Sequence, residues 1–156
     1  MKKYLFLAGL FIAAFFSCEG PEGPPGPSEE LNWKIITKTV RTNDWALVSD
    51  NGKGRPGDLN TYYMYELTNV RELTDFVYEE GLVFVYLVQS PGAKNEVLTP
   101  LPYVVPIGDE DSGDFWMETV TFDYLPGSVA FYVNYSDFET GIMHPGELTF
   151  RIVMIW

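Results

Sequence analysis

Short segments of alternating apolar and polar residues, separated by turn residues, set the strongest limit on how this chain can fold. The clearest is the C-terminal segment, in which Leu148, Phe150, Ile152, Met154 and Trp156 fall at every second position. Successive side chains of a β-strand point to opposite faces of a sheet, so this pattern predicts a strand with one apolar face. Aromatic residues make up 16% of the chain, which also favours strands.

Similar segments recur from residue 31 onward. The expected strands are residues 33–40, 46–48, 61–67, 82–88, 96–107, 115–124, 128–135 and 148–156. Residues 82–88 are almost wholly apolar, which predicts a strand buried on both faces. Three prolines, Pro100, Pro102 and Pro106, predict that residues 96–107 form an irregular strand at a sheet edge.

One short helix is expected at residues 71–80. Leu73, Phe76 and Val77 have helical spacing, and Gly81 stands where a helix C-cap belongs. Seven or eight short strands with one helix predict an all-β fold, an antiparallel β-sandwich over residues 31–156. A small β-barrel is the alternative.

The N-terminus has the features of an export signal. Lys2 and Lys3 precede residues 4–16, a mostly apolar run that is shorter than the ~20 residues of a membrane-spanning helix. Residues 1–17 are therefore expected to be a signal peptide, and Ser17 and Cys18 follow the apolar run.

The residues Phe15, Phe16, Ser17 and Cys18 resemble the lipobox of bacterial lipoproteins. That resemblance implies cleavage before Cys18 and acylation of its thiol, which would anchor the chain stably in a membrane. A plain secretory signal followed by an incidental cysteine is the alternative. The early acids Glu19 and Glu22 are similar to the surface-export signal of Bacteroidota lipoproteins, which implies an outer-membrane protein exposed at the cell surface.

Residues 18–30 are expected to form a tether after Cys18. Glycines at positions 20, 23 and 26 are each followed by proline and recur at every third residue, which is the collagen period. Three such triplets are too few for a stable triple helix alone. A stiff polyproline II spacer, reaching about 35–40 Å from residue 19 to residue 30, is the simpler interpretation. A trimer built with help from the folded domain is the alternative.

The whole layout resembles a set of Bacteroidota lipoproteins that join a lipidated cysteine and a Gly-Pro spacer to a β-rich domain. The matching stretches are short: residues 20–27, Leu73 and Thr74 with Gly81, residues 83–87, residues 101–103 and residues 150–153. The resemblance implies a lipoprotein of the cell envelope and brings no catalytic residues with it.

Composition excludes several functions. Ten basic and 22 acidic residues give a net charge of −12, which disfavours nucleic-acid binding. One cysteine excludes an internal disulfide, and one histidine, His144, gives little support for a catalytic triad. We expect no enzymatic activity and no resident cofactor.

An acidic loop is the one candidate metal site. Asp109, Asp111 and Asp114 supply hard oxygen ligands of the kind that Ca²⁺ prefers. The loop lacks the glycine and glutamate positions of an EF-hand, and a solvated turn is the alternative.

Tyrosine and tryptophan side chains are the candidate ligand-binding residues. Tyr62, Tyr63, Tyr65, Trp45 and Trp116 lie in or near expected strands, where such rings can stack on sugars or form a protein interface. Tyr62 and Tyr63 are neighbours in one strand, so both cannot face the core. Packing of most of these rings in the core is the alternative.

These features together predict a lipid-anchored envelope protein that binds a glycan or another protein without catalysis. The alternative is a structural subunit of an outer-membrane or periplasmic assembly.

The lipid anchor predicts the behaviour of a Cys18→Ser variant. The wild-type domain should be digested rapidly by protease added to intact cells, whereas the variant should be released into the soluble fraction because it lacks acyl chains. Fractionation and immunoblotting would measure both. Protection of the wild-type domain until the outer membrane is breached would place it in the periplasm instead.

Overall fold

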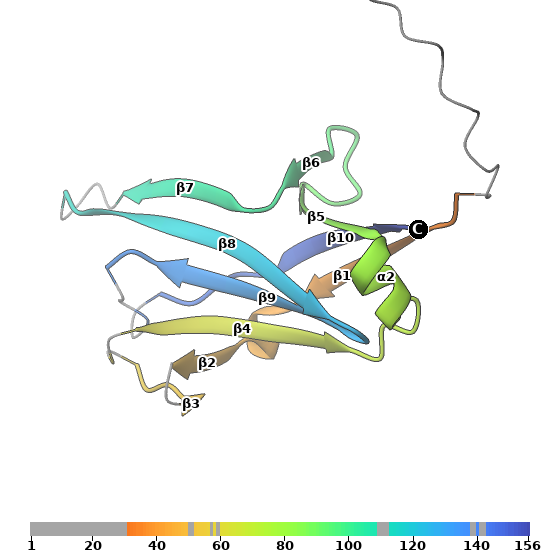
Figure 1. The fold of residues 1–156 in the computed structure, drawn as a ribbon. Helices are drawn as coiled ribbons and strands as arrows, with labels where there is room; N and C mark the ends of the chain where they lie inside the picture. Colours follow the sequence, from red (N-terminus) through yellow and green to blue (C-terminus); the bar gives the residue numbers. More distant parts are fainter. Residues whose placement is uncertain are drawn as a thin grey trace, which may run out of the picture. The chain divides into compact units, whose positions relative to one another are not determined.

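The computed structural model describes residues 31–49, 52–56, 58, 60–108, 113–137, 140 and 143–156 (Figure 1). Residues Leu31–Trp156 form one compact unit. The expected signal peptide of residues 1–17, Cys18, the tether of residues 18–30, Asp109 and Asp111 lie outside the described residues.

The described residues form ten strands, one 3-10 helix and one α-helix. The strands are β1 (Trp33–Val40), β2 (Ala46–Ser49), β3 (Gly52–Lys53), β4 (Thr61–Thr68), β5 (Leu82–Gln89), β6 (Val97–Pro100), β7 (Tyr103–Gly108), β8 (Phe115–Leu125), β9 (Ser128–Tyr135) and β10 (Leu148–Ile155). The helices are η1 (Thr42–Asp44) and α2 (Asp75–Glu80).

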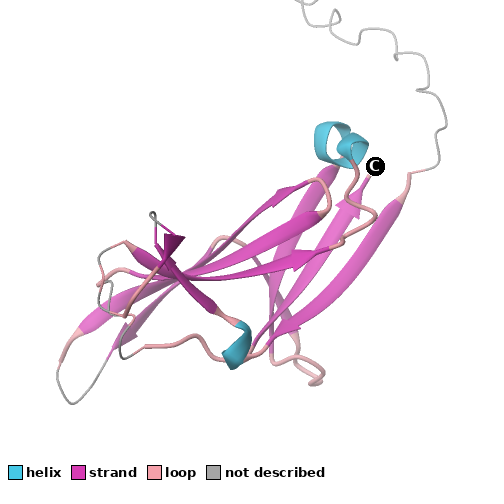
Figure 2. Cartoon of the chain, turned by 90° about the horizontal axis from the view of Figure 1, so that it is seen from below, coloured by secondary structure: helices cyan, strands magenta, loops and turns pink. Residues whose placement is uncertain are grey.

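The strands pair in two open antiparallel sheets, as Figures 1 and 2 show from two directions. The first has the order β1-β10-β5-β6 and the second the order β3-β2-β4-β9-β8-β7. Buried residues of both sheets belong to one hydrophobic core, so the predicted antiparallel sandwich is confirmed and the barrel is not formed.

The prolines act as the sequence predicts. Residues 96–107 form two strands, because the chain leaves the first sheet after Pro100 and enters the second at Tyr103. Both β6 and β7 are edge strands, where Pro106 interrupts no interior ladder. This division and the two-residue β3 raise the strand count above the seven or eight expected.

The helix is shorter than expected, because it begins at Asp75 rather than near residue 71. The Thr74 hydroxyl accepts a hydrogen bond from the Val77 amide at 3.3 Å, which caps the helix at this point. Gly81 ends it as predicted, and its amide donates to the Val77 carbonyl. A Cβ at Gly81 would lie 2.6 Å from that carbonyl oxygen, so close approach requires glycine.

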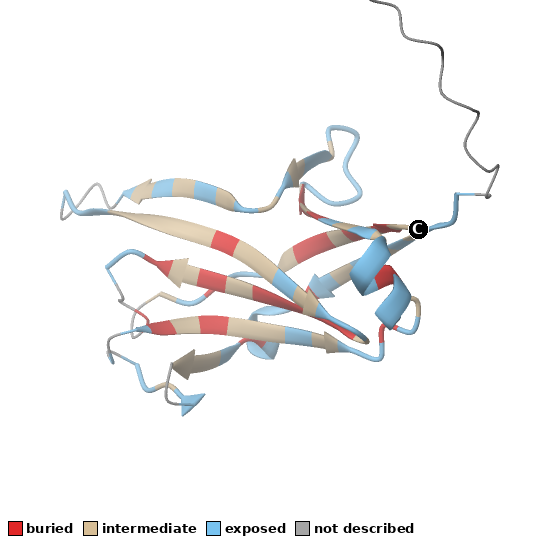
Figure 3. Ribbon diagram, viewed as in Figure 1, coloured by how far each residue is buried: buried red, intermediate tan, exposed pale blue. Residues whose placement is uncertain are grey.

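The centre of the core is a pair of stacked rings. Phe131 of β9 and Phe150 of β10 have 0% exposure, and their centroids lie 4.1 Å apart with planes inclined by 9°. Trp45 packs edge-on against Phe150 at 6.3 Å. Figure 3 shows buried positions running along the central strands of both sheets. The two phenyl rings therefore join the sheets at their most buried point.

Removal of one of these rings should strongly destabilise the fold. Phe150→Ala is expected to lower the free energy of unfolding by about 3–5 kcal/mol, because it opens a cavity between the sheets. Phe115→Ala is the control, since Phe115 is 79% exposed and its loss should change stability by less than about 0.5 kcal/mol. Urea denaturation followed by fluorescence measures both, and equal effects would contradict this role of the stack.

Candidate functional site

Two of the five predicted ligand-binding residues lie in the core, so their prediction is wrong. Trp45 is 6% exposed and Tyr63 is 4% exposed. Tyr63 faces inward because it pairs in register with the fully buried Val133, and its hydroxyl donates to the Thr140 and Met143 carbonyls. The Trp45 indole N–H donates to the Gly146 carbonyl at 3.2 Å. Neither ring is available to stack on a ligand.

The other three predicted residues do not form one surface. Tyr65 and Trp116 are half-buried and pack against the core, whereas Tyr62 lies on the opposite side of β4. The Tyr62 ring contacts Tyr132 edge-on at 5.8 Å. The predicted aromatic set is therefore divided between the inside and the outside of the larger sheet.

The predicted calcium site is described only in part. Asp114 is exposed, while Asp109 and Asp111 are outside the described residues. The described part of the chain contains no cluster of three or more histidine, cysteine, aspartate or glutamate side chains that fits a metal. The Ca²⁺ site stays a prediction.

An exposed apolar surface lies elsewhere, on the outer side of the four-stranded sheet. Trp33 and Ile35 of β1 are 65% and 45% exposed, and Leu82 and Phe84 of β5 are 57% and 43% exposed. The strand β10 lies between them, and its register places Ile155 beside Trp33 and Leu82, and Val153 beside Ile35 and Phe84. These six residues, which we name the apolar face, form two adjacent rows across three strands.

Two lysines of β1 share the inner side with Ile36 and Val40, while Trp33 and Ile35 take the outer side. Lys34 and Lys38 pair in register with Met154 and Phe150, which are fully buried, so both lysines start on the inner side. The Lys34 ammonium reaches Glu72 at 2.7 Å. The Lys38 ammonium lies 4.9 Å from the Tyr65 ring centroid. Long aliphatic stems let both charges escape the core while Trp33 and Ile35 remain outside.

The prediction that residues 82–88 are buried on both faces is wrong at the start of β5 and holds at Val88, an outward residue that is 4% exposed. Val85 and Leu87 are buried beneath the sheet, but Leu82 and Phe84 on its other side are exposed. A two-layer sandwich covers only the inner side of each sheet, so Leu82 and Phe84 on the outer side of β5 stay exposed. The sequence indicated an exposed apolar surface, because a strand that is apolar on both faces needs a covering layer on each face and a two-layer sandwich supplies only one.

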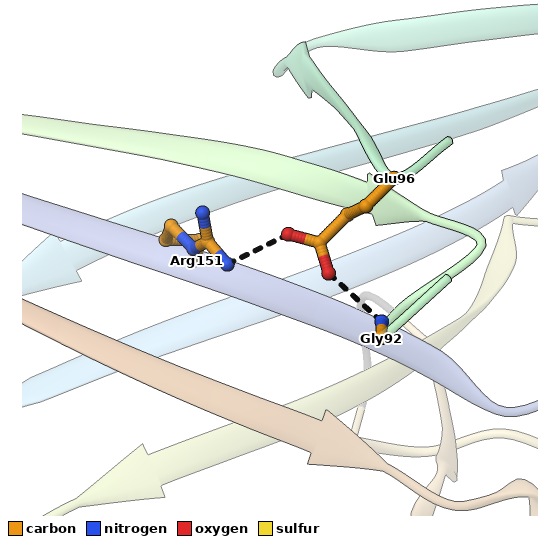
Figure 4. Close-up of polar contacts among 3 residues, drawn as sticks. All are labelled: Gly92, Glu96 and Arg151. Carbon is orange, nitrogen blue, oxygen red and sulfur yellow. Dashed lines mark hydrogen bonds and ion pairs between the residues drawn. The ribbon is translucent and has the colours of Figure 1, made fainter. Parts of the chain in front are cut away.

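The next row of the same sheet is polar and internally paired. The Arg151 guanidinium donates to the Glu96 carboxylate at 2.9 Å, and the other Glu96 oxygen accepts from the Gly92 amide at 2.9 Å (Figure 4). The Gly92 hydrogen bond and the neighbouring Arg151 hold the pKa of Glu96 below its usual value. These contacts fix the turn between β5 and β6 and neutralise the charge of Arg151.

Charge is depleted from this side of the sheet. Residues 31–156 contain 18 acidic residues, because Glu19, Glu22, Glu29 and Glu30 precede them, and eight basic ones, a net charge of −10. The outward positions of β1, β5 and β10 nevertheless carry only one charged residue, Arg151. Charge depletion around exposed aromatic residues is typical of the centre of a protein interface.

A half-buried acid lies inside the other sheet. Glu118 of β8 pairs in register with Tyr135 of β9. Burial raises the pKa of Glu118, and a hydrogen bond from Tyr135 partly opposes that shift. Burial and the Glu118 carboxylate raise the pKa of Tyr135 above its usual value. The pair lies on the core side of this sheet and is separate from the apolar face.

No protein-family model, curated protein or solved structure matches the chain. No helix among the described residues is long and apolar enough to cross a membrane. What the site does must therefore be argued from its own geometry.

Glu118 predicts a pH dependence of stability. The pKa of Glu118 in the folded state is raised above the unfolded value of about 4.3. Its contribution to the free energy of unfolding is therefore complete below a pH of about 4.3 and is lost as the pH rises through the folded pKa. The Glu118→Gln variant lacks this loss, so it should gain stability relative to wild type as pH rises above about 4.3. Urea denaturation at a series of pH values measures the difference, and parallel curves would contradict the assignment.

Proposed function

We propose that this chain is a lipid-anchored protein of the bacterial cell envelope that binds another protein through the apolar face. The exposed apolar face carries the proposal, because Trp33, Ile35, Leu82 and Phe84 are exposed among the described residues and flank the half-buried Val153 and Ile155 of β10. The proposed anchor at Cys18 and the tether would hold the domain near a membrane and present it to partners. The proposed activity is binding without catalysis.

A protein fits this face better than a glycan does. Sugar sites combine aromatic rings with hydrogen-bonding groups that fix the hydroxyls. Beside Trp33 and Phe84, the apolar face offers Ile35, Leu82 and the two aliphatic residues of β10. Trp33 and Phe84 are suited to fill pockets of a partner protein, as the anchor residues of interfaces do.

The net negative charge of the domain favours a partner that carries positive charge. Two copies of this domain would each bring a net charge of −10, which opposes their approach. A different protein, with an apolar patch surrounded by lysine and arginine, would be attracted by the same charge. A stable interface covers about 800 Å² on each side, so this partner is expected to extend from the apolar face over the row of Thr37, Arg151 and Tyr86.

Substitution of the two exposed aromatic residues tests the proposal. The double variant Trp33→Thr, Phe84→Thr keeps strand-forming side chains and should weaken the partner complex at least about 30-fold, as loss of interface anchors does. Phe115→Thr is the matched control, because it removes an exposed aromatic side chain from the other sheet. The partner would be recovered from cross-linked envelopes, identified by mass spectrometry, purified and titrated against all three chains.

Three results would contradict the proposal: equal affinity of the double variant and wild type, a partner without a basic surface, or a homodimer that the double variant abolishes. The last is measured by light scattering. The stoichiometry of the complex separates a one-to-one binding module from the alternative, a structural subunit of an envelope assembly.

A further inference from the structure

A second surface of distinct chemistry lies on the outer side of the six-stranded sheet. Strands β4, β9 and β8 lie side by side in this sheet (Figure 1). Tyr63, Val133 and Val120 of these strands are buried in the core. Successive side chains of a strand point to opposite sides, so the neighbours of these three residues face outward. This surface shares no residue with the apolar face.

The outward side chains of the three strands combine aromatic and polar groups. Tyr132 of β9 pairs in register with Met64 of β4 and with Thr121 of β8. One row further along, Asn134 of β9 pairs with Thr119 of β8. Residues paired in this way have Cβ atoms about 4.5–5.5 Å apart, so these groups adjoin one another. We name the tyrosine face by its six residues, Tyr62, Met64, Thr119, Thr121, Tyr132 and Asn134.

Two tyrosine rings form the apolar part of this face. The ring centroids of Tyr62 and Tyr132 lie 5.8 Å apart, with planes inclined by 62°. Both side chains are half-buried, and the Tyr132 hydroxyl donates a hydrogen bond to Asp123 at 2.9 Å. These contacts restrict the rings before any ligand arrives. A ligand that packs on them therefore costs little side-chain entropy.

The polar groups beside the rings are available to a ligand. Among the described residues, the side chains of Thr119, Thr121 and Asn134 have no hydrogen-bond partner. Each hydroxyl can donate and accept, and the amide offers two donors and one acceptor oxygen. All three side chains are half-buried on the outer side of the sheet, where water satisfies them. Ligand hydroxyls can replace that water at little cost.

Charge favours an uncharged ligand. The six residues of the tyrosine face carry no charge, and Glu66 and Asp123 flank it at one end, on either side of Ala130. Residues 31–156 have a net charge of −10, which opposes an acidic polysaccharide. A neutral sugar chain meets no such opposition.

We propose that the tyrosine face binds a neutral glycan, which lies across β4, β9 and β8. The carbon–hydrogen face of a sugar ring can pack on Tyr62 and Tyr132, because aromatic rings contribute a rigid apolar surface. Thr119, Thr121 and Asn134 exchange hydrogen bonds with the sugar hydroxyls and orient the chain. The apolar face lacks this combination, because it offers aromatic and aliphatic carbon without neighbouring amide or hydroxyl groups in its two rows.

A set of polysaccharides tests the proposal. The full chain in a polyoxyethylene detergent would be run by affinity electrophoresis in gels that contain soluble starch, arabinoxylan, galactomannan or mixed-linkage glucan. Polygalacturonate is the acidic counterpart. At least one neutral polysaccharide should retard the chain, and polygalacturonate should not. Free migration through every neutral polysaccharide, or stronger retardation by polygalacturonate, would overturn the proposal.

Variants locate the site. Tyr62→Leu and Tyr132→Leu should each weaken binding of the retarding polysaccharide at least about fivefold, because each removes a stacking ring. Tyr86→Leu is the matched control, since Tyr86 is a half-buried, outward tyrosine of the other sheet. Unchanged melting temperatures would confirm that each variant folds. If Tyr86→Leu weakens binding as much as the other two variants do, the site is not on the tyrosine face.

A third substitution tests the hydrogen bonds. Thr121→Val keeps the shape of a β-branched side chain and removes only the hydroxyl, so it should weaken binding at least about threefold. Wild-type affinity in Thr121→Val and in Asn134→Ala together would contradict the role of the polar groups.

Crossed measurements separate this site from the proposed function. The Trp33→Thr, Phe84→Thr variant should bind the polysaccharide as wild type does, and Tyr62→Leu should keep its affinity for the protein partner. Either site can then fail while the other stands. Loss of the protein partner in Tyr62→Leu, with polysaccharide binding unchanged, would overturn the proposal in favour of a second protein contact.

Discussion

The stacked rings of Phe131 and Phe150 are the contact on which the rest of the structure depends. They fix which side of β9 and which side of β10 faces the core, and antiparallel pairing passes that choice to the neighbouring strands. Because Phe150 points inward, its partners Lys38 on β1 and Leu87 on β5 also start on the inner side. The outward direction of Trp33 and Phe84 follows from this register. The apolar face is therefore a consequence of how the core is built.

The edges of the two sheets are protected against pairing with other chains. The edge strand β1 turns lysines inward, β6 and β7 carry prolines, and β3 has only two residues. Each is a known device against edge-to-edge association. With strand addition discouraged, the exposed faces are the surfaces left for recognition. If the domain binds a partner as proposed, side chains of a face would make the contact, and specificity would depend on the shape and polarity of that face.

Local patterns in the sequence predicted the class of fold but not which face of each strand is covered. Alternation in residues 148–156, the prolines of residues 96–107 and the glycine at position 81 each report a local backbone requirement, and each was confirmed. The inward direction of Tyr63 depends on its pairing with Val133, 70 positions away. A period of two shows which side chains share a face, but only long-range pairing decides which face is inside. The sequence pattern alone therefore does not show that the Trp45 and Tyr63 side chains are in the core and unavailable to a ligand.

The acidic charge of the domain and the neutrality of the apolar face have complementary physical roles. Charges act over about 8–10 Å at physiological salt, so the net charge of −10 would influence the approach of the proposed partner before contact. The apolar face acts only on contact, when water leaves its six side chains. Acidic side chains on this face would lose hydration on binding without a matched cation, at a cost of several kcal/mol each. A charged surround with an uncharged contact surface therefore gives attraction at a distance without a desolvation penalty at the centre of the interface.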